Sequence, residues 1–149
     1  MRNIRPHPRR RQSVLWRGGV NDQMEAYQLT RERVRHVVSE DQSGFYRLGY
    51  VLNGRFHTTY VGRSDTCLQR RLLVHARESW QEAFVARPAE NKAEAYRMEC
   101  LFYHLEQPDL GNKIHPGKPD GVSTECPYCL QEDAIANSST TFTNTTNAD

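Results

Sequence analysis

Two cysteines in the last quarter of the chain are spaced like metal ligands. Cys126 and Cys129 are separated by two residues, which is half of a zinc site. Cys100 and His104 lie four residues apart, so they share one face of a predicted helix. We expect these four residues to bind a structural Zn²⁺, with His115 able to replace either helical ligand. A redox pair or a chance pair is the alternative, although a redox motif begins a helix in a thioredoxin-like fold and a polar tail follows here.

Two tyrosines mark the far ends of a predicted β-hairpin. Asn53-Gly54, the strongest short-range hairpin signal, separates two runs typical of β-strands. The first run begins with Gly-Phe-Tyr at residues 44–46, and the second ends with Tyr-Val-Gly at residues 60–62. Because a hairpin brings the far ends of its strands together, we expect Tyr46 and Tyr60 to be neighbours. For either tyrosine alone, ordinary sheet packing is the simpler interpretation.

The register of this hairpin decides whether both phenols can serve one site. With a strict two-residue loop, Tyr46 would pair with Val61, and the two tyrosines would lie on opposite faces of the sheet. A one-residue break in the ladder moves one strand's side chains to the other face. If both tyrosines are functional, we therefore predict a β-bulge at Gly49 or a three-residue loop with Gly54 in the left-handed region.

The two tripeptides resemble the paired motifs that name the GIY-YIG nuclease family. The resemblance continues in the family's order through Leu-Gln-Arg-Arg-Leu at residues 68–72, Glu99 and Asn112, and it covers roughly residues 43 to 113. The interval between the tyrosines is a few residues longer than is common in that family. The resemblance implies a small, mainly antiparallel sheet flanked by helices, and it implies Mg²⁺-dependent hydrolysis of DNA.

An arginine of the predicted second helix would contact the scissile phosphate. Arg71 lies three residues after Leu68, so it borders the inward stripe of that helix. A structural ion pair would explain such a position equally well. The resemblance implies that Arg71 holds the phosphate and offsets charge in the transition state. Arg70 remains the alternative, because the spacing from Tyr60 is one residue longer than the family's.

The resemblance also implies a metal-binding glutamate and an asparagine after the third helix. Glu99 would bind Mg²⁺, which needs few protein ligands because it keeps most of its waters. Glu94 is the alternative carboxylate, and a simply solvated glutamate is the other interpretation of Glu99. Asn112 would orient a ligand or the loop, or it would be only a turn residue.

The general base would be Tyr60, or a water that Tyr60 orients, with Tyr46 assisting. An ordinary tyrosine is protonated near neutral pH, so this role needs a nearby cation. Arg63, Arg71 and the metal ion are candidates for that cation. His57 on the second strand is a competing base.

The remaining signals predict a three-stranded sheet packed by helices in an α/β (α+β) domain. A first helix should run from Asn21 or Asp22 to about residue 38 and cover the sheet. A second helix should span about residues 66–80, capped by Ser64 or Asp65. A short strand at residues 84–86 and a third helix at about residues 90–105 complete the order.

Composition suggests three segments in a chain of 149 residues. Residues 1–20 hold six arginines and no acid, which predicts a basic, disordered arm for a polyanionic partner. Residues 21–130 would form one domain that includes the Cys/His extension, and residues 131–149 a disordered polar tail. No run approaches the roughly 18 apolar residues of a membrane span, and no export signal is evident. We therefore expect an intracellular, cytoplasmic protein with thiols or metal ligands instead of disulfides.

DNA is the expected partner, and endonuclease activity is the preferred interpretation. A non-catalytic, zinc-stabilised module that only binds nucleic acid is the main alternative. A zinc-stabilised interaction domain that binds no nucleic acid is the third. Metal-dependent cleavage separates the first from the others, as does a common cleft for the tyrosines, the arginine and the glutamate.

Overall fold

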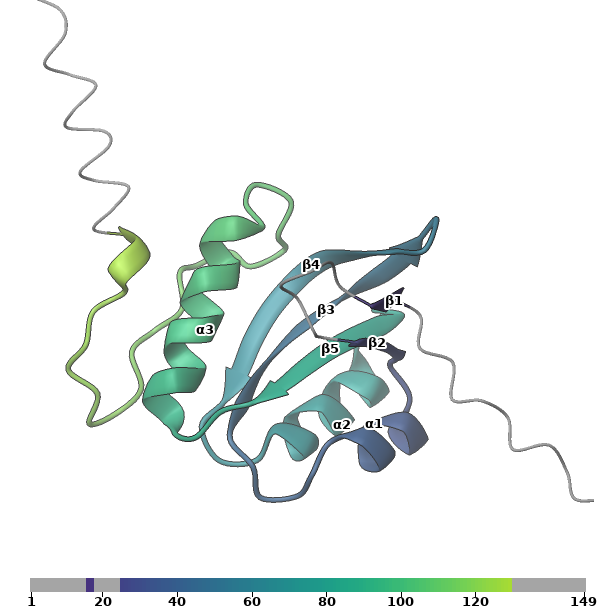
Figure 1. Cartoon of the computed structure of the whole chain (residues 1–149), viewed down its shortest axis with the longest axis horizontal. Helices are drawn as coiled ribbons and strands as arrows, with labels where there is room; N and C mark the ends of the chain where they lie inside the picture. Colours follow the sequence, from purple (N-terminus) through teal and green to yellow (C-terminus); the bar gives the residue numbers. More distant parts are fainter. Residues whose placement is uncertain (1–15, 18–24, 130–149) are drawn as a thin grey trace, which may run out of the picture.

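The computed structural model describes residues 16–17 and 25–129, and it has a mixed α/β fold built on an antiparallel sheet (Figure 1). The main helices of this part are α1 (Arg31–Val37), α2 (Leu68–Glu78) and α3 (Lys92–Leu105). Its strands are β1 (Trp16–Arg17), β2 (Glu25–Gln28), β3 (Gly44–Leu52), β4 (Arg55–Ser64) and β5 (Ala83–Pro88). Their order across the sheet is β1-β2-β5-β3-β4.

The sheet is larger than the predicted three strands. The predicted strands are β5, β3 and β4, which pair antiparallel. β2 adds to β5, and the two-residue β1 adds to β2, so Trp16–Arg17 belong to the sheet although we expected them in a disordered arm. The single helix predicted from about residue 21 is therefore wrong in its first part. Thr30 caps the shorter α1, because its side chain accepts a hydrogen bond from the backbone N–H of Arg33 at 3.2 Å.

The two later helices lie where the sequence predicts them, with slightly different ends. The cap of α2 is Cys67, and neither Ser64 nor Asp65 has this role. Its sulfur accepts a hydrogen bond from a backbone N–H of the first turn at 3.4 Å. Asn91 caps α3 in the same way through its side-chain oxygen, at 2.9 Å.

Helices cover both faces of the sheet, and the alternation of side chains along β3 shows which helix covers which face. Tyr46 and Leu48 point into the hydrophobic core that α1 and α2 complete. Phe45 points the other way and stacks on Phe102 of α3, with ring centroids 5.0 Å apart. Figure 1 shows the same arrangement, with α1 and α2 together on one side and α3 on the other. β4 is the outer strand of the sheet, and both α2 and α3 pack against it, one from each face.

The hairpin of β3 and β4 contains one break in its register. Between the turn and Gly49 the strands pair regularly, and Gly49 lies opposite Thr58. Beyond the break Leu48 pairs with Tyr60, which leaves Thr59 as the extra residue of a bulge. Tyr60 therefore shares a face with Leu48 and with the other tyrosine. The prediction of a bulge at Gly49 is confirmed.

Glycine is required at this bulge. A Cβ atom at Gly49 would overlap the backbone carbonyl group of His57. We expect Gly49→Ala to lower the free energy of unfolding by about 1–3 kcal/mol, because the backbone must shift to make room. Gly117→Ala is the matched control, since a Cβ there meets nothing within 4 Å. Urea unfolding followed by circular dichroism measures both variants, and equal stabilities would contradict the bulge.

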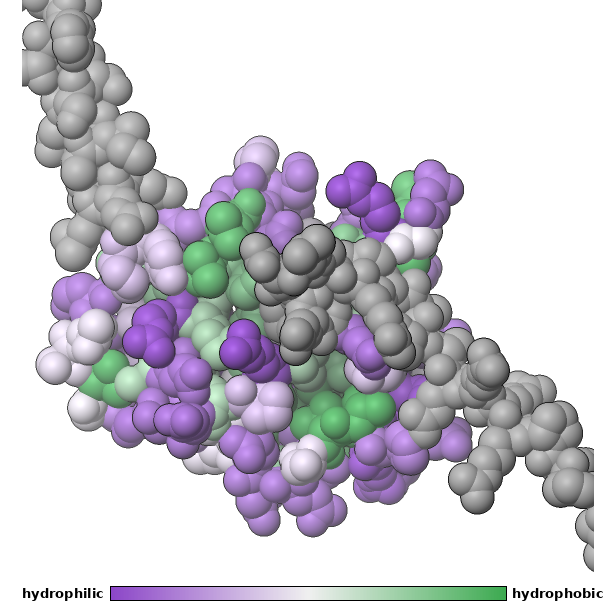
Figure 2. Space-filling model, viewed as in Figure 1, coloured by the Kyte–Doolittle hydropathy of each residue, from purple (hydrophilic) through white to green (hydrophobic). Residues whose placement is uncertain are grey.

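No helix within residues 16–17 and 25–129 is both long enough and apolar enough to cross a membrane. On the coloured surface of Figure 2, hydrophobic residues form separate small areas within a mostly hydrophilic face. Apart from β1, the predicted arm (1–20) and the predicted tail (131–149) lie outside the described residues, so their disorder stays a prediction.

Candidate active site and metal-binding cluster

Tyr46 and Tyr60 lie side by side on the face of the sheet that α2 covers. Their ring centroids are 6.3 Å apart, and both rings contact the imidazole of His75, with centroids 5.1 and 5.8 Å away. A hydrogen bond of 2.6 Å joins the Tyr46 hydroxyl and His75 Nε2. Burial raises the pKa of Tyr46, while burial and the charge of Arg71 lower the pKa of His75. The phenol is therefore the donor, and the neutral imidazole accepts.

Arg71 completes this cluster from the preceding turn of α2. Hydrogen bonding with Tyr46, and more weakly with Tyr60, raises the pKa of Arg71. The side chain is otherwise exposed, so its remaining donors face solvent. Arg70 is also exposed, but its position on the helix is turned by roughly 100° from that of Arg71. Of the two arginines, Arg71 is the one placed beside the phenols.

Gly62 allows Tyr46 to reach this position. The two residues pair across the strands, and a Cβ at Gly62 would overlap the phenol oxygen of Tyr46. The ring of Tyr46 therefore lies over the outer strand β4, where only a glycine leaves room for it. This contact gives a physical reason for the glycine that ends the second tripeptide.

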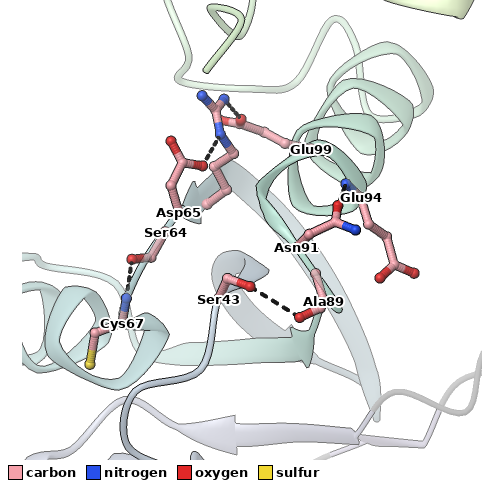
Figure 3. Close-up of polar contacts among 9 residues, drawn as sticks. Ser43, Ser64, Asp65, Cys67, Ala89, Asn91, Glu94 and Glu99 are labelled. Atoms are coloured by element: carbon pink, nitrogen blue, oxygen red, sulfur yellow. Dashed lines mark hydrogen bonds and ion pairs between the residues drawn. The ribbon is translucent and has the colours of Figure 1, made fainter. Parts of the chain in front are cut away.

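Glu99 lies on α3, across β4 from the tyrosines, and it binds Arg63. The Arg63 guanidinium contacts Glu99 Oε2 at 2.5 Å and Asp65 Oδ1 at 2.8 Å. Figure 3 shows the two carboxylates on either side of this guanidinium, one coming from α3 and the other from the residue after β4. Burial raises the pKa of Glu99, and the contact with Arg63 opposes that shift. The negative charge of Glu99 also contributes, as the smallest of several causes, to the raised pKa of Tyr46.

Asn112 binds the outer edge of β4 beside the tyrosines. Its side-chain amide donates to the Val61 carbonyl at 2.8 Å and accepts from the Val61 N–H at 2.9 Å. The neighbouring Gly111 N–H donates to the carbonyl of Thr59, the bulged residue, at 2.6 Å. The loop after α3 thus covers the bulge, and Asn112 positions the strand that carries Tyr60.

The histidine of this site is one that sequence reasoning missed. His57, the expected competing base, lies nearer the hairpin turn and stacks on Tyr50, with ring centroids 5.1 Å apart. His75 contacts both phenols instead. Its signal in the sequence was its position four residues after Arg71, one turn along the same side of the helix.

The alternative carboxylate has a structural task. Glu94 accepts a hydrogen bond at 2.6 Å from the backbone N–H of Glu90, the residue before the cap, so it ties the start of α3 to the chain that leads into it. Figure 3 shows Glu94 pointing away from Glu99. Between the two, Glu99 is the carboxylate whose charge contributes to the raised pKa of Tyr46.

A second cluster joins the end of α3 to the last described residues. The ligand atoms of His104, His115, Cys126 and Cys129 all lie within 4.8 Å of one another. Neighbouring pairs are closer, with nitrogen–nitrogen and sulfur–nitrogen distances of 3.3–3.5 Å. A tetrahedral zinc site with bonds of about 2.0–2.3 Å has ligand atoms about 3.3–3.8 Å apart. These four residues can therefore hold a metal ion.

The ligand set differs from the preferred prediction in one residue. His115, the predicted alternative, takes the place of Cys100, which is not in the group. His115 Nδ1 lies 2.8 Å from the carbonyl oxygen of Pro116, so it donates there and leaves Nε2 to face the cluster. Cys100 is fully buried against Tyr96 and Cys126, and burial raises its pKa to about 12. It is a core thiol.

The surroundings of the Cys-x-x-Cys pair favour metal over redox chemistry. A helical turn begins after Cys126, as it does in redox motifs. However, Cys129 Sγ lies 3.4 Å from His104 Nε2 and 3.3 Å from His115 Nε2. Two imidazoles aimed at two thiols form a closed set of four ligands.

Comparisons with protein-family models, with curated proteins and with solved structures each return no match for this chain.

Proposed function

We propose that this protein is a metal-dependent endonuclease of the GIY-YIG type that hydrolyses phosphodiester bonds in DNA. The observation that supports this most is the bulge at Gly49, because it brings Tyr46 and Tyr60 together beside Arg71. Simple sheet packing would not require a guanidinium beside both phenols. It would also not require Gly62, whose missing side chain makes room for a phenol oxygen.

In the proposed reaction a water molecule attacks phosphorus, and the bond to the leaving oxygen breaks. Arg71 binds a non-bridging phosphate oxygen through its exposed donors and offsets the negative charge that develops there. Tyr60, which lines a pocket of about 460 Å³, orients the water and, in its phenolate form, accepts the proton of that water; Arg71 is the nearby cation that this role needs. Tyr46 and His75 position Tyr60, because the Tyr46 hydroxyl donates to His75 Nε2 and both rings contact the ring of Tyr60.

Glu99 is the residue that would hold Mg²⁺. A single carboxylate fits this ion, because Mg²⁺ keeps several waters and takes substrate phosphate oxygens as further ligands. The carboxylate of Asp65 lies on the other side of Arg63 and could contribute through water. When bound, Mg²⁺ would polarise the phosphate and stabilise the leaving oxygen. Arg63 neutralises Glu99 in the absence of the ion.

Substitution of the two neighbouring arginines tests the proposal. We expect the purified protein to cleave DNA with Mg²⁺ and not with a chelator, in an assay that includes supercoiled, linear, branched and single-stranded forms. Arg71→Ala should lower the cleavage rate by about 10²–10³-fold, because a donor to the transition state is lost. Arg70→Ala is the matched control and should cleave within a few-fold of the parent.

Each other outcome has a definite meaning. Loss of activity in Arg70→Ala alone would show that Arg70, and not Arg71, binds the phosphate. DNA binding by the parent protein without metal-dependent cleavage would contradict the nuclease and favour a non-catalytic nucleic-acid-binding module.

We also propose that the four-residue cluster binds Zn²⁺ and is structural. Two thiolates and two imidazoles are a preferred zinc set, and four protein ligands leave no open position for a substrate. His104 lies in the last turn of α3, whereas Cys126 and Cys129 come after the long loop. The ion would therefore fix both ends of the loop that carries Asn112. In this way zinc supports the outer edge of the active site.

A further inference from the structure

Trp80 is a large aromatic side chain that the fold leaves in solvent. It follows α2, and 79% of its surface is exposed. It lines the same pocket as Tyr60 and His75, together with the apolar Leu48 and Leu110. An exposed indole beside a candidate active site favours binding of a ligand, because the ligand would cover the apolar surface of the indole and remove it from water.

The segment that carries Trp80 is fixed by hydrogen bonds on both sides. The N–H of Ser79 donates to the His75 carbonyl at 2.8 Å, and the N–H of Gln81 donates to Ser79 Oγ at 3.1 Å. The side chain of Gln81 accepts from Thr59 Oγ1 at 2.6 Å. Trp80 therefore stands on a segment tied to α2 and to the bulge of β4, so the backbone that carries the indole is held in place relative to these two elements.

The lining of the pocket indicates which part of a nucleic acid would enter it. No Lys or Arg is among its lining residues in the described part of the chain, and the carboxylate of Asp109 borders it. A phosphate would be repelled there, while Arg71 lies on the neighbouring turn of α2 to receive one. A flat, uncharged nucleobase matches the apolar lining and the indole face.

We propose that Trp80 stacks on an unpaired nucleobase next to the scissile phosphate, so that the preferred substrate is DNA with single-stranded character. This inference rests on the proposed nuclease function. In a regular duplex each base is covered by its neighbours and has no free face, so an intact duplex could not use Trp80 without unstacking a base.

The test compares the binding of a single strand and of a fully paired duplex of the same length. The protein carries Glu99→Gln to prevent cleavage during the measurement. Adding Trp80→Ala should weaken binding of the single strand roughly ten- to hundredfold, which is the effect of losing one stacked base. Binding of the duplex should change less than twofold, and Trp80→Phe should retain most of the affinity. Leu52→Ala, which trims another exposed apolar side chain, should change neither.

Fluorescence provides a second readout. The chain has two tryptophans, so a Trp16→Phe background leaves Trp80 as the only indole. Single-stranded DNA should quench its emission, and duplex should not. Unchanged binding of the single strand by Trp80→Ala, or equal losses for both DNA forms, would overturn the stacking role. Those results would leave the nuclease proposal standing if Arg71→Ala still lowers the cleavage rate by about 10²–10³-fold. Failure of the parent protein to bind or cleave any DNA would overturn both.

Discussion

Glu99→Gln is expected to abolish Mg²⁺-dependent DNA cleavage, with a rate at least about a hundredfold lower than that of the parent. The substitution keeps the shape of the side chain and removes the negative charge that would attract the ion. Arg63 retains a partner, because Asp65 still binds it and the amide oxygen at residue 99 can accept its hydrogen bond. The fold and DNA binding should therefore survive while the chemistry is lost.

The matched control is Glu94→Gln, because Glu94 lies on the same helix as Glu99 and less than two turns before it. Glu94 accepts a hydrogen bond from the backbone N–H of Glu90, and a glutamine can accept the same bond, so cleavage should remain within a few-fold of the parent. Cleavage rates as a function of Mg²⁺ concentration measure both variants. Full activity of Glu99→Gln would rule out this residue as the metal ligand. Loss of activity in Glu94→Gln alone would move the metal to the first turn of the helix.

The hairpin could be predicted in detail because local chemistry decides its geometry. Asn53-Gly54 sets the turn, and the requirement that two tyrosines share a face demands one register break. Gly49 is the position where the backbone of β4 comes too close for a side chain. The same reasoning could not find β2, because Tyr27 and the valines that follow it fit one helical stripe. Only pairing with β5, which lies far along the chain, makes residues 25–28 a strand.

Only some of the residues that form the site could be predicted from the sequence, because contacts between distant parts of the chain decide the others. Helical periodicity places Arg71 and His75 on one side of α2, but it cannot show that this side meets the hairpin. His57 is on the same strand as Tyr60, so the sequence made it a plausible base. In the structure it lies between the turn and the bulge, where it pairs with Tyr50. The choice between Cys100 and His115 depended on the path of a loop without regular structure, which no periodicity describes.

Loss of the proposed zinc ion should lower the stability of the protein and its activity together. We expect Cys126→Ser to remove the one bound zinc per chain and to lower the free energy of unfolding by about 3–4 kcal/mol, the linkage expected for a ligand present at a hundred to a thousand times its Kd. A strong chelator should have the same effect on the parent protein. Metal analysis and thermal unfolding measure both.

Three further variants show which side chains bind the ion. Cys67→Ser is the matched control, because Cys67 caps α2 and is not among the four ligands, and serine is a good helix cap. It should retain zinc and stability. His115→Ala should lose the ion, whereas Cys100→Ala should keep it at some loss of core packing. The opposite pattern would restore Cys100 as the ligand.

The coupling to activity follows from the loop between the ligands. Asn112 holds both backbone groups of Val61, and it lies only three residues before His115. Without the ion, His115 no longer ties this loop to α3, so the edge of β4 beside Tyr60 loses part of its support. Asn112→Ala in the zinc-loaded protein should therefore reproduce the loss of cleavage that we expect for Cys126→Ser, while leaving the zinc content at one per chain. A Cys126→Ser protein that is metal-free, stable and fully active would show that the cluster has no structural role.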